Sequence, residues 1–114
     1  MTTEQIAEAF SRHAFATTYP HIAEGVVWDN VGGPQITGRA ELIETCDQSA
    51  AYLAGVTTTF SRFRSVVGEN TVVIDSLADY IDGDGETTTV ASCDIYDFTD
   101  GLLSRITSYT MELS

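Results

Sequence analysis

Apolar residues recur at helical spacing in two segments of the first half of the chain. In residues 2–18, the positions that share one helical face are Ile6, Phe10, His13, Ala14 and Thr17. Thr2 and Gln5 match a capping box at the start of this segment, and Pro20 is of a residue type that ends helices. We therefore predict a first helix from Thr2 to about Thr18.

A second helix is predicted over residues 39–54, with Thr37 as its cap and Gly55 as its stop. Its apolar face consists of Leu42, Ile43, Cys46, Ala50 and Leu53. Between the two helices, residues 25–31 (GVVWDNV) are β-branched and aromatic and run into the turn segment 32–34. This stretch predicts a short strand followed by a loop.

The second half of the chain consists of four runs rich in Thr, Val, Ile, Tyr and Phe. These runs span residues 57–67, 71–81, 86–98 and 102–113, and short segments containing glycine separate them. Turn-bounded runs of this composition are typical of consecutive antiparallel strands joined by hairpins. Helices followed by a long meander indicate one α+β domain over residues 1–114, with helices packed on a curved sheet.

A long curved sheet with helices on one side forms a cone-shaped half-open barrel, and the space between the two layers is a natural ligand pocket. The opposite face of the sheet must be solvated or buried against a second copy of the chain. Because the residues available for that face still include Phe, Tyr and Val, we expect a homodimer formed through the outer face of the sheet.

The charge balance restricts the partners of the protein. Seventeen Asp and Glu residues stand against five arginines, lysine is absent, and the formal net charge is −12. Without lysine, the chain has no Schiff-base chemistry, no lysine general base and no phosphate-binding loop lysine. A charge this negative argues against binding of nucleic acid or of an anionic membrane surface. Most of the acids fall on predicted helix exteriors and in turns, where they solvate the domain.

Three further residue patterns add exclusions. Residues 1–20 contain charged side chains throughout, so they form neither a signal peptide nor a membrane span, and we expect a cytoplasmic protein. Cys46 and Cys93 lie outside any C-x-x-C motif, which favours two free, packed thiols, with a disulfide as the alternative. His13 and His21 lack the spacing of metal ligands, so we expect no metal site and no cofactor.

Asp29 is the first candidate for proton-transfer chemistry. It follows Trp28 at the end of a predicted strand and precedes a glycine-rich loop. A carboxylate that looks into a cavity beside an aromatic wall is well placed to act as a general base. The alternative is an Asp that merely starts the turn, which is a frequent role of this residue type.

Asp94 and His13 are the other two candidates. Strand alternation places Asp94 on one face with Tyr96 and Phe98, but alternation does not decide whether this face is buried or in water. If it is buried, the carboxyl group either finds partners or becomes protonated. His13 shares a helix face with Phe10 and is expected to point inward, either as a catalytic group or as a core residue.

Together these passages resemble the nuclear-transport-factor-2-like superfamily, which includes SnoaL-like polyketide cyclases and ketosteroid isomerases, over nearly the whole chain. Residues 26–44 (VVWDNVGGPQITGRAELIE) resemble the strand-loop-helix passage of that superfamily. Residues 90–109 (VASCDIYDFTDGLLSRITSY) resemble its last hairpin. Within the superfamily, the site pattern is most similar to that of the ketosteroid isomerases.

The resemblance implies a role for each candidate. Asp29, before the loop 30–32, would shuttle the proton, and a protonated Asp94 would donate to the substrate oxygen. His13 stands where the family has a donating tyrosine on its first helix. The rest of the substrate pocket is expected to consist of Trp28, Phe10, Tyr96, Phe98 and Ile106.

The function implied in this way is that of an isomerase that moves a proton next to the carbonyl group of a small hydrophobic ligand. One alternative is a non-catalytic ligand-binding or dimerisation module of the SnoaL-like group, and another is a structural domain whose cone is filled by its own side chains. Epoxide hydrolases of this superfamily need an Asp-Arg-Asp arrangement with an acid near the end of the last strand, and the cyclases commonly use an acid there. Residues 108–111 (SYTM) provide none, which counts against both activities.

Overall fold

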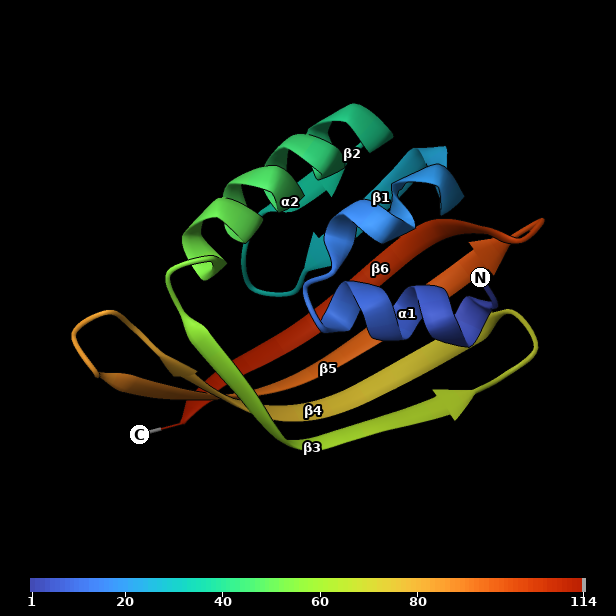
Figure 1. Cartoon of the computed structure of the whole chain (residues 1–114). Helices are drawn as coiled ribbons and strands as arrows, with labels where there is room; N and C mark the ends of the chain where they lie inside the picture. Colours follow the sequence, from blue (N-terminus) through green and yellow to red (C-terminus); the bar gives the residue numbers. More distant parts are fainter. Residues whose placement is uncertain (114) are drawn as a thin grey trace.

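A curved sheet covered on one face by helices makes up the fold seen in the computed structural model, which describes residues 1–113 (Figure 1). The elements in chain order are α1 (Thr3–Ser11), a 3-10 helix (Phe15–His21), β1 (Ile22–Asn30), β2 (Gln35–Thr37), α2 (Arg39–Leu53), β3 (Thr57–Val67), β4 (Thr71–Ile81), β5 (Thr87–Thr99) and β6 (Leu102–Leu113). The predicted α+β class is confirmed. None of the helices within these residues is both long and apolar enough to cross a membrane.

The sheet combines the predicted meander with an N-terminal strand pair. Over the described residues its strand order is β2-β1-β6-β5-β4-β3, and the sheet is not closed into a barrel. Strands β3 to β6 pair antiparallel with their sequence neighbours, as predicted. Strand β1 runs parallel to β6, and the short β2 pairs antiparallel with β1. The mixed sheet therefore brings the first strand of the chain beside the last.

Three irregularities in the strand pairing accompany the curvature of the sheet. The register shifts between Ile22 and Val27 in β1 and between Phe60 and Arg62 in β3. It also shifts opposite Asp97 and Phe98 of β5, where Ser104 is the extra residue in β6. Extra residues of this kind bend a strand and increase its twist. Figure 1 shows β3 bending at this level and α1 and α2 lying over the same, concave side of the sheet. The opposite side is convex and carries no helix.

Helix α1 begins as predicted and ends early. The capping box is present: the backbone N–H of Gln5 donates to Thr2 Oγ1 (3.1 Å), and the backbone N–H of Thr2 donates to Gln5 Oε1 (2.8 Å). The predicted extension to about residue 18 is wrong, because α1 stops at Ser11. His13 has a φ of 69°, a left-handed conformation that an α-helix does not continue through. The chain then resumes as the 3-10 helix Phe15–His21.

Helix α2 begins at Arg39, as predicted, but its cap is Gly38 rather than Thr37. Thr37 is the last residue of β2 and pairs with Val27 of β1, so its backbone belongs to the sheet. Gly38 has a φ of 94°, which turns the chain from β2 directly into the helix. The three-residue strand β2 was not predicted, because so short a stretch shows no alternation.

The hydrophobic core lies between the helices and one end of the concave face. Its largest fully buried side chains include Tyr96 of β5, Ile106 of β6 and Ile6 of α1. On β4, Val72 and Ile74 are fully buried, whereas Tyr80 near the other end of the strand is half-buried. Packing is therefore dense at one end of the layers and open at the other, which leaves room for a cavity there.

Candidate functional site

Strand β5 presents Asp94 to the concave face of the sheet. Tyr96 is fully buried in the core, and side chains two positions apart on a strand share a face, so Asp94 points toward the helices as well. Asp94 is paired in register with Ile74 of β4 and with Ser108 of β6, both of which are buried. Strand alternation left open whether this face of β5 is buried or in water. The structure shows that it is buried, with Asp94 between the helices and the sheet.

Hydroxyl groups surround the Asp94 carboxyl group in a network that we call the Asp94 network. Ser11 of α1 donates to Asp94 Oδ2 (3.0 Å), and the Ser11 hydroxyl is 2.6 Å from the Tyr96 hydroxyl. On the other side, Trp28 Nε1 donates to Ser108 Oγ (3.0 Å), and the Ser108 side chain also hydrogen-bonds Asp94. The network therefore joins α1, β1, β5 and β6 around a carboxyl group.

Burial and hydrogen bonding act in opposite directions on this carboxyl group. Burial raises the pKa of Asp94 above its ordinary value, while hydrogen bonds from Ser108, Ser11 and Tyr96 favour the charged form and oppose the rise. Burial is the larger effect. Asp94 consequently holds a proton at a higher pH than an exposed Asp does, although it is ringed by donors.

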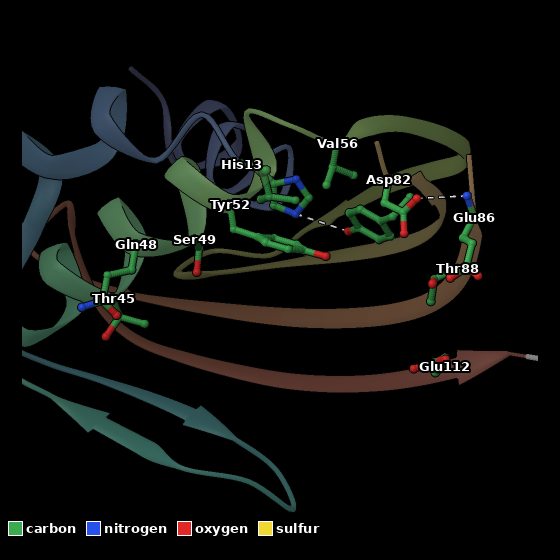
Figure 2. Close-up of a pocket in the computed structure, with 12 residues that line it drawn as sticks. His13, Thr45, Gln48, Ser49, Tyr52, Val56, Asp82, Glu86, Thr88 and Glu112 are labelled. Atoms are coloured by element: carbon green, nitrogen blue, oxygen red, sulfur yellow. Dashed lines mark hydrogen bonds between the residues drawn. The ribbon is translucent and has the colours of Figure 1, made fainter. Parts of the chain in front are cut away.

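A cavity of about 700 Å³ lies between α2 and the far ends of β4, β5 and β6. Its lining includes polar and aromatic side chains of α2, His13 after α1, and residues around the β4–β5 turn (Figure 2). The lining residues are His13, Thr45, Gln48, Ser49, Tyr52, Leu53, Val56, Tyr80, Asp82, Glu86, Thr88 and Glu112. This volume falls within the range of small-molecule sites, which is roughly 300–1,000 Å³.

His13 and Tyr80 form a hydrogen-bonded pair in the wall of this cavity. His13 Nε2 is 3.3 Å from the Tyr80 hydroxyl, drawn as a dashed line in Figure 2. The left-handed backbone of His13 directs its ring toward Phe60 and Tyr80, with ring centroids 6.2 and 5.8 Å away. Burial lowers the pKa of His13, so the imidazole is neutral at neutral pH. Burial, and then the charge of Asp94, raise the pKa of Tyr80, so its hydroxyl keeps its proton.

The Asp94 network and the cavity are neighbours rather than one site. Among residues 1–113, Asp94 does not line the cavity, whereas Thr88, nearer the start of the same strand, does. The link between the two is electrostatic, because the charge of Asp94 acts on the Tyr80 hydroxyl. Of the three predicted catalytic residues, the structure thus places His13 in the cavity wall and Asp94 behind it.

Asp29 lies on the other side of the sheet. In β1 it follows Trp28, whose side chain packs on the core and bonds Ser108, so alternation turns Asp29 to the convex face. There its Oδ2 is 3.5 Å from Arg105 Nη2 in a partly exposed ion pair. The expected convergence of Asp29 with Asp94 and His13 on one cavity is therefore not what the structure shows.

The five expected pocket residues fill space instead of enclosing it. Phe10, Tyr96, Phe98 and Ile106 are buried core residues, and Trp28 packs against them. Phe10 makes edge-to-face contacts with Trp28 and Tyr96, with centroids 5.2 and 5.8 Å apart. None of these five residues lines the cavity formed by the part of the chain that the structure describes. The five apolar and aromatic residues expected around Asp94 therefore belong to the hydrophobic core at one end of the sheet. The cavity lies at the other end.

Several residues of the site carried little signal in the sequence. Tyr80 is two residues after Ala78, the last of the alternating buried positions of β4, so strand alternation alone could have placed it on the concave face. Tyr52, on α2, is exposed and outside the apolar stripe of that helix. Ser11 and Ser108 are small polar residues in helix and strand positions that no motif marks.

The two cysteines and the acidic groups provide no further centre. Cys46 and Cys93 are free thiols, the first in the core and the second on the convex side. Burial raises the pKa of Cys46 to about 12, so this thiol stays protonated. Over residues 1–113, no three His, Cys, Asp or Glu side chains gather closely enough to hold a metal ion.

Comparisons with known proteins bear on this architecture. Residues 3–106 match the family described as SnoaL-like domain. No curated protein matches the sequence. A structure of an NTF2-like protein of unknown function from Cytophaga hutchinsonii is similar with a TM-score of 0.83 and 29% identity, covering 94% of this chain and 94% of that chain.

Two more distant structures share the fold. One is an LEH-like epoxide hydrolase from M. tuberculosis, with a TM-score of 0.68 and 20% identity over 96% of this chain and 84% of that chain. The other is a protein from Catenulispora acidiphila with a ketosteroid isomerase-like fold, solved in complex with trimethylamine. Its TM-score is 0.69, with 12% identity over 96% of this chain and 86% of that chain. At such identities the similarity establishes the fold, which hosts different activities.

Proposed function

The chain belongs to the SnoaL-like domain family of the NTF2-like superfamily, and from this premise we propose that it binds a small organic molecule in the cavity between α2 and the concave face of the sheet. The observation that carries the proposal is the hydrogen-bonded pair of His13 and Tyr80 in the wall of a cavity of about 700 Å³. A neutral imidazole beside a protonated phenol is an acid/base pair that a bound ligand can reach.

The finer proposal is proton transfer next to the carbonyl group of the ligand. His13 would remove a proton from the carbon beside the carbonyl, and the Tyr80 hydroxyl would hydrogen-bond the oxygen of the resulting enolate. His13 would then return the same proton to another carbon of the conjugated system, so that the reaction is an isomerisation without a co-reactant. Asp94 does not contact the ligand in this scheme; burial first, and then the charge of Asp94, raise the pKa of Tyr80, so the phenol stays protonated and can donate. Asp29 has no part in this scheme, since it lies on the convex face.

The isomerisation of a β,γ-unsaturated cyclohexenone to its conjugated isomer tests this proposal, because the product absorbs in the ultraviolet. We expect Tyr80→Phe and His13→Asn each to lower the rate at least about a hundredfold, a usual effect of losing an acid/base group. Asp29→Asn is the control and should leave the rate unchanged. Loss of activity in Asp29→Asn together with full activity in Tyr80→Phe would place the reaction elsewhere.

A non-catalytic binding module is the second candidate. The observation that favours it is that the Asp94 network is internal: its hydroxyl groups bond the carboxyl group, and none of its five members is in the described cavity lining. Under this alternative, ligands bind and no ketone is turned over. Binding without turnover would then be seen for every unsaturated ketone tried, with His13→Asn changing affinity alone.

Binding itself can be mapped by NMR with adamantanol, a compact neutral probe. We expect amide shifts at Ser49, Tyr52 and Thr88, which line the cavity. Amides of Cys93 and Tyr109, which pair on the convex side, should not move. Shifts confined to the convex side would contradict the proposed site.

A further inference from the structure

The cavity has an acidic end. Asp82, Glu86 and Glu112 all line it, and they come from the β4–β5 turn and from the adjacent end of β6. Glu112 is in register with Val90, close to the start of β5, so the three carboxyl groups belong to the same end of the sheet. Glu86 and Glu112 are exposed, and Asp82 is half-buried. No arginine occurs among the described lining residues.

The cations of this chain are used elsewhere. There is no lysine, and each of the five arginines has a partner outside the cavity. Arg12 stacks on Phe63, Arg39 donates to the backbone oxygen of Tyr19, Arg62 and Arg64 pair with Asp75, and Arg105 pairs with Asp29. No side-chain cation of the described residues is therefore left to neutralise the acids of the cavity.

The remaining polar groups of the lining also suit a positive charge. Tyr52 and Tyr80 contribute aromatic rings, whose faces attract cations. His13 is uncharged, since burial lowers its pKa. One oxygen of Asp82 accepts backbone N–H groups of Asp84 and Glu86 (2.9 and 3.0 Å), which leaves its second oxygen for a ligand. Figure 2 shows Tyr52 extending from α2 over the sheet, and Asp82 at the β4–β5 turn with its hydrogen bond to Glu86 drawn as a dashed line.

We infer that the cavity selects organic cations, namely protonated amines with an apolar body, over neutral and anionic molecules of the same shape. This inference rests on the proposed binding function and specifies its ligand class. Three carboxylates around a partly enclosed space create a negative potential that attracts a cation and repels a carboxylate or phosphate. The charged group lies toward Asp82, Glu86 and Glu112, and the apolar body extends toward His13.

Three probes with one adamantane cage separate charge from shape: amantadine as the cation, adamantanol as the neutral form and adamantanecarboxylate as the anion. Affinities are measured by NMR titration of the cavity amides in the full-length protein. We expect amantadine to bind most tightly and adamantanecarboxylate most weakly. Added salt should weaken the binding of amantadine and leave that of adamantanol unchanged, because salt screens charges at a partly exposed site.

A charge-matched pair of variants localises the effect. Glu86→Gln with Glu112→Gln removes two charges from the cavity, and Glu24→Gln with Glu69→Gln removes two exposed charges outside its lining. The cavity variant should bind amantadine about tenfold more weakly and adamantanol equally well. The control variant should bind all three probes as the wild type does. All four positions are exposed, so the fold is retained in both variants.

The outcomes distinguish the two levels of the proposal. If adamantanol binds as tightly as amantadine, or if the control variant loses as much affinity as the cavity variant, the inference is overturned and the proposed binding function stands. If none of the probes shifts the cavity amides, the proposed function falls and the inference falls with it. The salt dependence in the wild-type protein tests the inference independently of any substitution.

Discussion

At the scale of single residues, the surroundings of Asp94 set the pKa of its carboxyl group and, through it, the dependence of stability on pH. Its pKa is raised, so the native state holds the proton more tightly than the unfolded chain does. The charged form is therefore disfavoured by folding, and the native state gains stability as the pH falls through the folded pKa toward the unfolded value. The donors in the Asp94 network limit this cost, because each one that bonds the carboxylate lowers the pKa again.

Ser108→Ala tests that balance. The substitution removes a donor to Asp94 and the acceptor of Trp28 Nε1, which leaves a polar indole group without its partner. We expect a loss of about 1–3 kcal/mol of unfolding free energy and a further rise in the pKa of Asp94. Urea denaturation and carbon NMR of the carboxyl group measure the two effects. Ser61→Ala, at an exposed position, is the control, and an equal loss there would contradict the explanation.

His13 gives a pH dependence of the opposite sign. Its pKa is lowered in the folded protein from the ordinary value of 6.5. Below that pH the unfolded chain takes up the proton first, so stability is lost as the pH falls from 6.5 toward the folded pKa.

His13→Asn should remove this loss, because Asn does not titrate and tolerates a left-handed backbone. Urea unfolding at a series of pH values compares the wild type with this variant. If the unfolding free energy of the wild type does not change as the pH falls below 6.5, the pKa of His13 is not lowered by folding and the prediction is wrong. His13→Ala adds a second check: it also removes the titrating ring, so the loss of stability between pH 6.5 and the folded pKa should disappear in this variant too.

Alternation predicted the residues that share a face with Asp94 and could not predict which face is inside. Both faces of β5 contain apolar side chains and one acid, so the hydrophobic pattern has no clear direction. The answer depends on Trp28 and Ile106, which pair across β1 and β6 and point to the core. The same pairing turns Asp29 outward, and that long-range contact leaves no local signal in the sequence.

At the scale of elements, the strands were predicted best and the connections worst. The four long strands have bounds close to those expected, because turn segments mark both ends of each run. The parallel pairing of β1 with β6 joins segments far apart in the chain, and nothing in either segment specifies it. The end of α1 was missed, because the left-handed residue there is His13 rather than glycine.

Gly38 is the element boundary that a substitution tests most directly. Its φ of 94° is unfavourable for any other residue, while a Cβ atom at this position would meet nothing within 4 Å. Gly38→Ala should therefore cost about 1–2 kcal/mol of unfolding free energy through backbone strain alone. Gly83→Ala is the matched control, because it also has open space and lacks a positive φ, and it should change stability by less than about 0.5 kcal/mol. Equal effects would refute the strain argument.

At the scale of the whole molecule, the convex face of the sheet carries exposed apolar side chains, and we expect the homodimer to form there. Tyr109 and Met111 are 50% and 64% exposed there. With Val31 and Cys93 they border a groove of about 380 Å³. Arg62 and Asp75 of the same groove form an ion pair, so a second copy of the chain can cover this surface without burying an unpaired charge. Dimerisation remains a prediction.

Met111→Glu should therefore convert a dimer into a monomer, because a charge in the centre of an apolar interface is costly to bury. Light scattering after size-exclusion chromatography gives the mass in solution. Tyr52→Glu, at an exposed position on α2 over the opposite side of the sheet, adds the same charge and should leave the dimer intact. A wild-type protein of monomeric mass would show the homodimer prediction to be wrong.

Because Trp28 donates a hydrogen bond to Ser108, the fluorescence of this tryptophan should report the ionisation of Asp94. Trp28 is the single tryptophan of the chain, and its indole is separated from the Asp94 carboxyl group by one hydroxyl. A charge that appears so close to an indole shifts its emission. Intrinsic fluorescence recorded across an acid titration therefore reports the ionisation of one buried carboxyl group among seventeen acids, without isotopic or chemical labelling.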